Sequence, residues 1–509
     1  MPPRNFNLIL FAVVVSILCH LTYRNTRTAS IIGEAVDLIE QNYVDPIDRR
    51  ELVMAAMQGV VTKLDEHSSY FAVDAYESFQ DSMHQEFAGI GIYVDQLEPE
   101  SPVRVVTPLV GSPALRAGVL PNDLIVRVDG QDVSKLPLTE VSDRLKGAPG
   151  TTVQLVVRRG DQQQTIDVRR ATIELESVVG DHRDSSNRWV YRLQSDPTVA
   201  YLRLKSFGEK TVQELQAVLA ELDNDYQALV LDLRGNGGGL LYAARDVCDM
   251  FLSSGVIVST RVRGGRIEES YSATAGTLVD PRIPVAVLVD GNSASASEIV
   301  AACLQDNGRA IVVGTRSYGK GTVQEIIPLE YGRSALRLTV ARYYRPNNKN
   351  IHRLSDATEE DEWGVTPDPG FVVPMDMASI LKLNLRWRTA SYPMLAGIDP
   401  PELPIIDPDP AGTAPIQQDL APQAIEAGPA KTPVVDPESP PESVDAGGQS
   451  PPELSAEAQA HVDRGPVELS DDPPLRAAVG ALLDRLKSQS VPDSPDSPNS
   501  PAAVKRQAA

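Results

Sequence analysis

Three short segments combine residue types that could carry out nucleophilic chemistry. The first runs from an apolar strand pattern at 285–290 through Gly291-Asn292 into the serine cluster 293–297, and a helical pattern follows from Ile299. Strand, tight turn, serine and helix together present a hydroxyl at a helix N-terminus, where free N–H groups and the helix dipole stabilise an oxyanion. Serine is also a preferred capping residue, so a cap without a catalytic role is the alternative interpretation.

The second segment places a lysine where a solvated charge is unusual. Lys320 lies between Gly319 and Gly321, at the start of a pattern that predicts a strand. If the amine is buried, desolvation lowers its pKa until the neutral form can act as a general base toward a serine. Gln324 follows four residues later, and if this stretch is a strand, the two side chains share a face and the amide can hold the amine in position. A surface lysine in a glycine-rich turn is the alternative.

The third segment, residues 231–240, also changes from a strand to a helix, through the glycines at 237–239. Glycines permit positive φ angles and close approach, so their N–H groups could donate to an oxyanion. The segment is not a phosphate loop, because no lysine follows in Walker spacing and the G-x-G-x-x-G order is absent. A turn without a role is the alternative here.

Other catalytic groups have less support in the sequence. The six histidines are scattered, which lowers the odds of a Ser-His-Asp triad. No H-E-x-x-H motif or clustered ligand set occurs, and the three cysteines form neither a C-x-x-C pair nor a disulfide framework. The net charge of −22 argues against a nucleic-acid partner. We therefore expect serine and lysine chemistry without a metal or an organic cofactor.

The patterns around these segments predict several modules, as a length of 509 residues suggests. Apolar residues three and four apart between 30 and 83 predict amphipathic helices, which could pack, dimerise or cap the next domain. Between 87 and 173 the apolar period is two and turn signals separate short runs, which indicates a small antiparallel β domain. From Thr198 onward strands and helices alternate, as in a layered α/β domain with parallel pairing.

Both ends of the chain depart from globular composition. Leu8–Leu21 is an apolar stretch of signal-peptide length, shorter than the ~20 residues that span a bilayer. No A-x-A cleavage pattern follows it, which favours an uncleaved anchor over a cleaved signal. After Ser391, proline, acidic and small residues dominate, which predicts a solvated tail. Within this tail, Leu475–Leu486 predicts a short amphipathic helix, preceded by the carboxylates of Asp471-Asp472.

Together the three segments resemble the carboxyl-terminal processing peptidases, also called tail-specific proteases, over about residues 30–374. The most specific elements are SASASE at 293–298 and YGKGTVQ at 318–324. This resemblance implies the following site residues: Ser295 as nucleophile, Lys320 as general base, Gln324 as the residue that orients the lysine, and an oxyanion hole formed by the N–H of Ala296 and that of Gly238 or Gly239.

The β domain resembles a PDZ module, with Gly89-Ile90-Gly91-Ile92 in place of the carboxylate-binding loop. Successive N–H groups there would receive the terminal carboxylate of a peptide while the peptide adds a strand. Lys146 occupies the place of a basic residue that relatives link to activation. The sequence departs from the family after Tyr343–Pro346, where 347–350 and an acidic stretch replace a short Ser-Gly-Arg-like turn.

We therefore predict an α/β protein with a layered, ClpP/crotonase-like protease core, an inserted small β PDZ domain, an N-terminal helical arm and a disordered, acidic, proline-rich C-terminal tail. The expected segments are 1–28 as signal peptide or membrane anchor, 29–85 as helical region, 86–173 as PDZ domain, 174–390 as Ser/Lys peptidase domain, 391–470 as disordered proline-rich segment, 471–489 as C-terminal helix and 490–509 as disordered tail.

The predicted function is that of an exported serine endopeptidase, periplasmic or otherwise extracytoplasmic and anchored to the inner membrane by its N-terminal segment. Its partners would be protein or peptide substrates with accessible C-termini, the membrane and, as an open question, further copies of the chain. Two alternatives stay open: a non-catalytic PDZ scaffold, and an acyl-thioester hydrolase or isomerase on a crotonase-like fold, which would need an adenine-nucleotide pocket.

Overall fold

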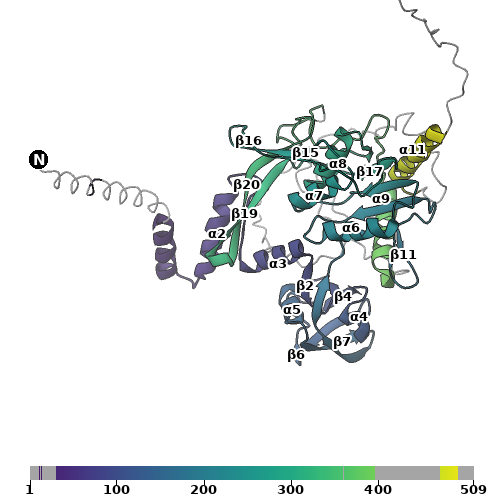
Figure 1. The fold of residues 1–509 in the computed structure, drawn as a ribbon. Coiled ribbons are helices and arrows are strands. Elements are labelled where there is room, and N and C mark those ends of the chain that lie inside the picture. The colour runs from purple at the N-terminus through teal and green to yellow at the C-terminus, as the bar shows by residue number, and fades with distance from the viewer. Residues whose placement is uncertain (1–10, 12, 14–29, 359, 396–470, 491–509) are drawn as a thin grey trace, which may run out of the picture. The chain divides into compact units, whose positions relative to one another are not determined.

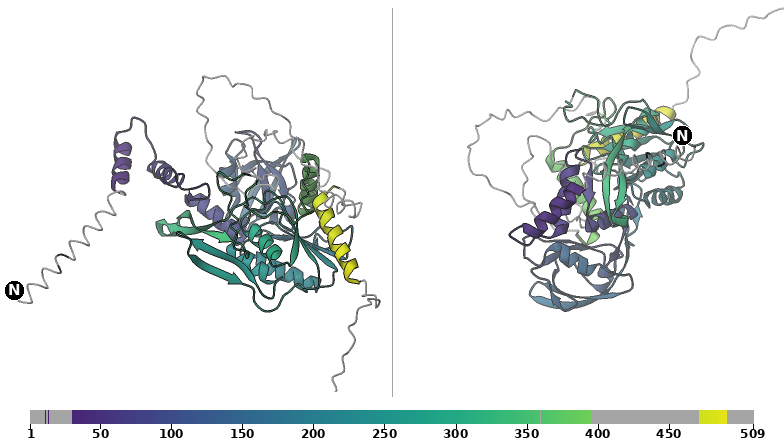
Figure 2. Two further views of the ribbon diagram at one scale, coloured as in Figure 1. Left: turned by 90° about the horizontal axis from the view of Figure 1, so that it is seen from above. Right: turned by 90° about the vertical axis from the view of Figure 1, so that its left-hand side faces the viewer.

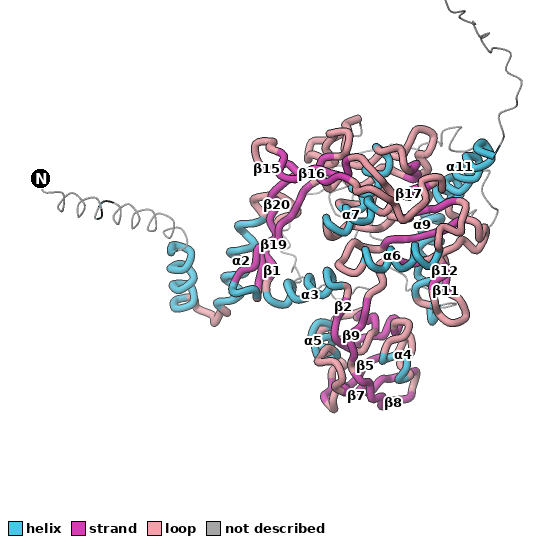
Figure 3. Tube along the Cα trace, in the orientation of Figure 1, coloured by secondary structure: helices cyan, strands magenta, loops and turns pink. Residues whose placement is uncertain are grey.

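The computed structural model describes residues 11, 13, 30–358, 360–395 and 471–490 (Figures 1 and 3). The predicted anchor therefore lies outside the described residues, except for Phe11 and Val13, and so do the tail segments 396–470 and 491–509. In the described ranges, no helix combines the length and the apolar character that crossing a membrane requires. The chain divides into two compact units, one formed by residues 1–76 and 324–339 and the other by the remainder.

The first unit contains the predicted helical arm. A helix covers 30–42, and α2 (Arg49–Val61) begins at Asp48, whose side chain accepts a hydrogen bond from Arg50 N. The short strand β1 (Ser69–Phe71) pairs antiparallel with residues 335–337 of β20 (Ser334–Tyr344), and β19 (Thr322–Leu329) also pairs with β20. Many apolar side chains of the arm helices are exposed, including Ile31, Leu38 and Val53.

The second unit contains the predicted β domain. Its strands run in the order β3-β4-β5-β7-β8, with β6 beside β5, and all pairs are antiparallel. β2 pairs with β9 outside this sheet. Alternate side chains such as Val103, Ile125 and Leu155 fill its core, as the period of two predicts. The elements are β2 (Glu86–Gly89), β3 (Ile92–Asp95), β4 (Val103–Pro108), α4 (Pro113–Ala117), β5 (Leu124–Val128), β6 (Gln131–Asp132), α5 (Leu138–Leu145), β7 (Thr152–Arg159), β8 (Gln162–Arg169) and β9 (Ala171–Glu174).

The α/β core of the second unit is built on a five-stranded sheet with the order β10-β13-β14-β17-β18. The last four strands are parallel and β10 is antiparallel to β13. These strands are β10 (Val178–Val179), β13 (Val199–Leu204), β14 (Ala228–Asp232), β17 (Val285–Val289) and β18 (Ala310–Gly314). They are almost entirely buried, which explains why they read as continuous apolar runs.

Helices cover both faces of this sheet. Leu202, Leu231 and Val287 belong to the cluster that packs against α6 (Thr211–Leu222), α7 (Leu241–Asp249) and α8 (Ala296–Asp306). The alternate side chains, such as Tyr201 and Val230, pack against α11 (Pro473–Ser490), the yellow helix of Figures 1 and 2. The core is therefore a three-layer α/β/α arrangement, and α11 spans the helix predicted at 475–486. The other elements are α3 (Val73–His84), β11 (His182–Arg183), β12 (Trp189–Val190), β15 (Val256–Val262), β16 (Ile267–Ser272), η1 (Glu330–Gly332), α9 (Met377–Ser391) and η2 (Pro393–Leu395).

Candidate active site

The three segments singled out in the sequence follow three neighbouring parallel strands. Residues 233–239 follow β14, 290–295 follow β17 and 315–321 follow β18, and these strands lie side by side in that order. Because the carboxyl ends of parallel strands meet at one edge of a sheet, the topology gathers the three segments there.

The serine turn has unusual backbone geometry. Ser295 is the N-cap of α8 with φ 54° and ψ −112°, and it is 7% exposed. Such a backbone conformation is costly for a residue with a side chain, so the surrounding structure must hold it in place. The Ser295 N–H donates a 2.8 Å hydrogen bond to Glu298 Oε2. Ser295 and Glu298 also form a capping box for α8, so this turn caps the helix while its backbone is strained.

The glycine segment lies directly against this turn. Gly238 has φ 102°, and a Cβ on it would lie 2.8 Å from Ser295 Cβ and 2.9 Å from Ala296 N, so a side chain does not fit. The Gly238 N–H donates to Asn236 Oδ1 at 2.9 Å. Within the described part of the chain, no such bond engages the N–H of the exposed Gly239. The Asn236 carbonyl in turn accepts the N–H of Ala294 at 3.0 Å, which fastens the two turns together.

The lysine lies in a turn and not within a strand. β19 begins at Thr322, so the expected alternation of Lys320 and Gln324 along one strand does not apply. The Lys320 side chain is half-buried, and the preceding Gly319 has φ 89° and packs so closely that a Cβ would lie 2.9 Å from the Trp363 ring. Gln324 belongs to the first unit, where its Nε2 lies 3.3 Å from Thr339 Oγ1.

A buried carboxylate joins the serine turn to the lysine turn. Glu298 is fully buried; its Oε2 accepts the N–H groups of Ser295 and Lys320, both at 2.8 Å. Its Oε1 accepts the Ser317 hydroxyl at 2.5 Å and the Gly319 N–H at 2.7 Å. Burial raises the pKa of Glu298 to about 7, while these four hydrogen bonds oppose the shift. The sequence carried a signal for this role, because a lone glutamate lies among apolar residues three positions after the serine.

Tyr343 is a second residue near Ser295 that sequence reasoning missed. Its side chain is buried, and its N–H donates to the Gly321 carbonyl at 2.8 Å, next to the lysine. Burial raises the pKa of Tyr343 to about 12, and a hydrogen bond from the Ser295 side chain opposes this rise. The tyrosine hydroxyl therefore lies beside the serine hydroxyl, although no motif in the sequence pointed to it.

The predicted carboxylate-binding loop connects β2 to β3. The carbonyl of Ile90 accepts the N–H of Ala114, and that of Gly91 accepts the N–H of Leu109, both at 3.0 Å. β3 is the terminal strand of its sheet, so among the described strands only β4 pairs with it. The outer edge of β3, which begins at Ile92, is therefore not paired with a described strand, and peptide addition requires an unpaired edge of this kind.

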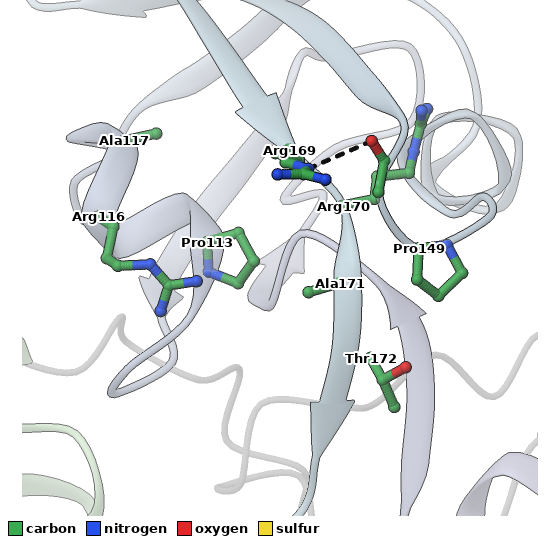
Figure 4. A pocket seen from close by; sticks show the side chains of 9 residues that line it. Pro113, Arg116, Ala117, Pro149, Arg169, Arg170, Ala171 and Thr172 are labelled. Carbon is green, nitrogen blue, oxygen red and sulfur yellow. Dashed lines mark hydrogen bonds between the residues drawn. The ribbon is translucent and has the colours of Figure 1, made fainter.

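A separate pocket of about 540 Å³ lies elsewhere on the β domain (Figure 4). It is bordered by α4, β8 and β9, and Arg116, Arg169 and Arg170 contribute its charged side chains. Arg169 donates to the Gly150 carbonyl at 3.3 Å and Arg170 to the Leu145 carbonyl at 3.0 Å. The pocket contains none of the site residues predicted from the sequence. Among the described residues, no group of three or more His, Cys, Asp and Glu side chains is arranged to hold a metal.

Comparisons with known proteins agree with this architecture. The family model described as Peptidase family S41 matches residues 198–369, and a PDZ domain model matches 104–159. A carboxy-terminal-processing protease of Bartonella bacilliformis is 37% identical over 367 residues, which cover 70% of this chain and 78% of that protein. A carboxyl-terminal-processing protease of Picosynechococcus is 36% identical, covering 67% of this chain and 77% of the relative.

The solved structure of a photosystem II D1 C-terminal processing protease is 28% identical to this chain, with a TM-score of 0.37, and the match covers 68% of this chain and 92% of the other. Both curated relatives are more than 30% identical to this chain, and the match covers more than three quarters of each relative. The chain therefore belongs to the carboxy-terminal processing proteases of peptidase family S41, which makes it a serine-type peptidase with a PDZ domain.

Proposed function

We propose that the protein is an endopeptidase whose catalytic pair is Ser295 and Lys320. The observation that supports this best is the Glu298 carboxylate, because one of its oxygens lies 2.8 Å from the backbone nitrogens of both residues. In this mechanism Ser295 Oγ attacks the scissile carbonyl and the neutral Lys320 amine takes its proton. The protonated amine then passes the proton to the leaving amine, and water hydrolyses the acyl-enzyme. The resemblance to the family supports Gln324 as the residue that orients the lysine.

The oxyanion hole in this proposal consists of the Ala296 N–H and a glycine N–H. Gly239 is the better donor of the two glycines, because the Gly238 N–H is already bonded to Asn236. Gly238 then has a steric role, since it lets the glycine turn approach Ser295. Two donors aimed at the developing negative charge are the usual means of stabilising a tetrahedral intermediate.

Substrate selection in this proposal depends on the PDZ domain. The loop Gly89, Ile90, Gly91 and Ile92 receives the C-terminal carboxylate, and the open edge of β3 supports the addition of the peptide as a strand. Main-chain hydrogen bonds then tolerate many sequences. A peptide ending in a free carboxylate is therefore expected to have a lower KM than the same peptide with an amidated end.

The proposal retains the ClpP/crotonase-like assignment of the core, which the parallel sheet with helices on both faces supports. It also retains an extracytoplasmic location with an inner-membrane anchor at 8–21, on the strength of the apolar sequence alone. Assembly into a homo-oligomer is compatible with the exposed apolar side chains of the arm.

Turnover of an unfolded protein with a nonpolar C-terminal tail tests the catalytic pair. Ser295→Ala and Lys320→Ala are expected to abolish cleavage, while Ser185→Ala and Lys349→Ala, at exposed positions, are expected to leave it unchanged. The pH profile of kcat should rise in the neutral to mildly alkaline range, well below the ~10.4 of a free lysine. Cleavage at the wild-type rate by Ser295→Ala would show that another group is the nucleophile.

A further inference from the structure

The glycine segment of the active site is tied to the C-terminal helix by a buried ion pair. Arg234, 2% exposed, donates from Nη1 to Asp472 Oδ1 at 2.7 Å and from Nη2 to Asp472 Oδ2 at 3.0 Å. The same guanidinium binds Asp232 with three further hydrogen bonds of 2.6–3.2 Å. A planar guanidinium held by two carboxylates in this way has a fixed orientation.

Arg234 is part of the turn that carries the proposed oxyanion donor. The next residue, Gly235, donates its N–H to Asp290 Oδ1 at 3.0 Å. The residue after that, Asn236, accepts the N–H of Ala294 in the serine turn through its carbonyl. Gly238 lies four residues after Arg234. A change in the backbone of Arg234 would therefore displace the backbone of Gly238 through a short, hydrogen-bonded turn. The orientation of this side chain therefore bears on where the glycine N–H groups point.

Asp472 has two structural tasks at once. Besides binding Arg234, its Oδ1 accepts the N–H of Leu475 at 3.2 Å and so caps the N-terminus of α11. Arg386 of α9 lies 3.6 Å from its Oδ2. The helix that follows is anchored by apolar side chains that are no more than 1% exposed, among them Leu475, Val479 and Leu482. The position of Asp472 is thus fixed by the packing of a whole helix.

Electrostatics favour this arrangement only while both carboxylates are present. Burial would lower the pKa of Arg234, but Asp232 and Asp472 outweigh that and raise it well above its usual value. The Tyr201 hydroxyl also donates to Asp232 Oδ2 at 2.7 Å, so this carboxylate accepts hydrogen bonds from two residues, Arg234 and Tyr201. Without Asp472 the guanidinium keeps its carboxylate partner Asp232 at one end. Among the described residues, the hydrogen-bond partner left to Nη1 is then the Met375 sulfur at 3.9 Å.

We propose that Asp472 is a positioning residue for the peptidase reaction: through Arg234 it sets the geometry of the glycine turn, so that the C-terminal helix completes the active site. The inference rests on the proposed oxyanion role of this turn. It also gives α11 a role in the reaction besides covering the sheet.

The test compares variants of the full-length chain by kcat, KM and melting temperature. Asp472→Asn keeps a capping side chain but makes an amide nitrogen face one of the N–H donors of the guanidinium. It is expected to lower kcat about tenfold or more with KM within about twofold, because a small displacement of catalytic groups has large kinetic effects. The matched control Asp471→Asn alters a neighbouring, exposed carboxylate that pairs with Lys382, and kcat should stay within about twofold of wild type.

A second control separates positioning from stability. Val479→Ala weakens the packing of α11 without touching Arg234, and it is expected to lower the melting temperature while leaving kcat of the folded enzyme unchanged. Wild-type kcat in Asp472→Asn, or an equal loss of kcat in Val479→Ala, would overturn the proposal. If Asp472→Asn does not fold, Asp472→Glu, which moves the carboxylate by one methylene, takes its place with the same expected and contrary results. Activity remaining in Ser295→Ala would instead contradict the proposed function, so the two failures are distinguishable.

Discussion

Replacing Glu298 by glutamine tests whether one buried carboxylate holds the serine turn and the lysine turn together. In the wild type each oxygen accepts two hydrogen bonds, so the amide nitrogen of the variant must face two donors whichever way it turns. If the amide nitrogen faces Ser317 and Gly319, the Ser317 hydroxyl can rotate and accept a hydrogen bond from it, but the Gly319 N–H loses its partner. If it faces Ser295 and Lys320, two backbone N–H groups lose theirs.

A buried donor without a partner costs about 1–3 kcal/mol. The cheaper orientation of the glutamine amide should therefore lower the free energy of unfolding by about 2 kcal/mol, and the other by about 4 kcal/mol. The effect on kcat should exceed the effect on KM, because the turns that move carry the proposed nucleophile and the proposed base. A loss of kcat of about tenfold or more is expected.

Urea unfolding and steady-state kinetics measure the two effects. Glu221→Gln is the matched control, because Glu221 is exposed and lies near the end of α6. Its unfolding free energy should stay within about 0.5 kcal/mol of wild type. If Glu298→Gln behaves like this control in both stability and kcat, the carboxylate does not hold the turns and the reasoning is wrong.

Three further predictions follow from the same site. Burial raises the pKa of Glu298 in the folded protein to about 7, above the 4.5 of an unfolded glutamate. The resulting contribution to stability is full below about pH 4.5 and is lost as the pH rises through 7, so urea unfolding should show a decline over this range that Glu298→Gln lacks. Gly238→Ala should abolish turnover and lower the melting temperature, because its Cβ would lie 2.8 Å from Ser295 Cβ, whereas Gly237→Ala, with open space around it, should leave kcat within a few-fold of wild type. Tyr343→Phe removes the hydroxyl beside the nucleophile and should change kcat several-fold with little change in KM, and an unchanged kcat would place this hydroxyl outside the reaction.

Sequence patterns predicted those parts of the fold in which the burial of apolar side chains determines both the local periodicity and the packing of the elements. The alternation of apolar residues predicted the β domain, with α4 and α5 at the expected places, and the alternation of strands and helices predicted the layered core. The three segments of the site were also identifiable, because glycines and serines after buried strands are a local signal.

Long-range contacts were not predictable in this way. Glu298 appeared in the sequence as part of a motif, but its bonds to Lys320 and Gly319 depend on two loops brought together by the sheet. Nothing in the local pattern related Arg234 to Asp472, which is separated from it by 238 positions along the chain. The pattern also placed Lys320 at the start of a strand, whereas the close packing of Gly319 on Trp363 keeps it in a turn.

The register between β17 and β18 sets the relative position of the serine turn and the lysine turn at the edge of the sheet. Val285 lies opposite Ala310 and Val289 opposite Gly314, so the serine turn and the lysine turn leave the sheet at matched heights. A slip of one residue between these strands would offset the two turns by about 3.3 Å, the rise of one strand residue. Apolar side chains deep in the sheet thereby set the spacing of the proposed nucleophile and base, and substitutions there are expected to change the reaction rate before they unfold the enzyme.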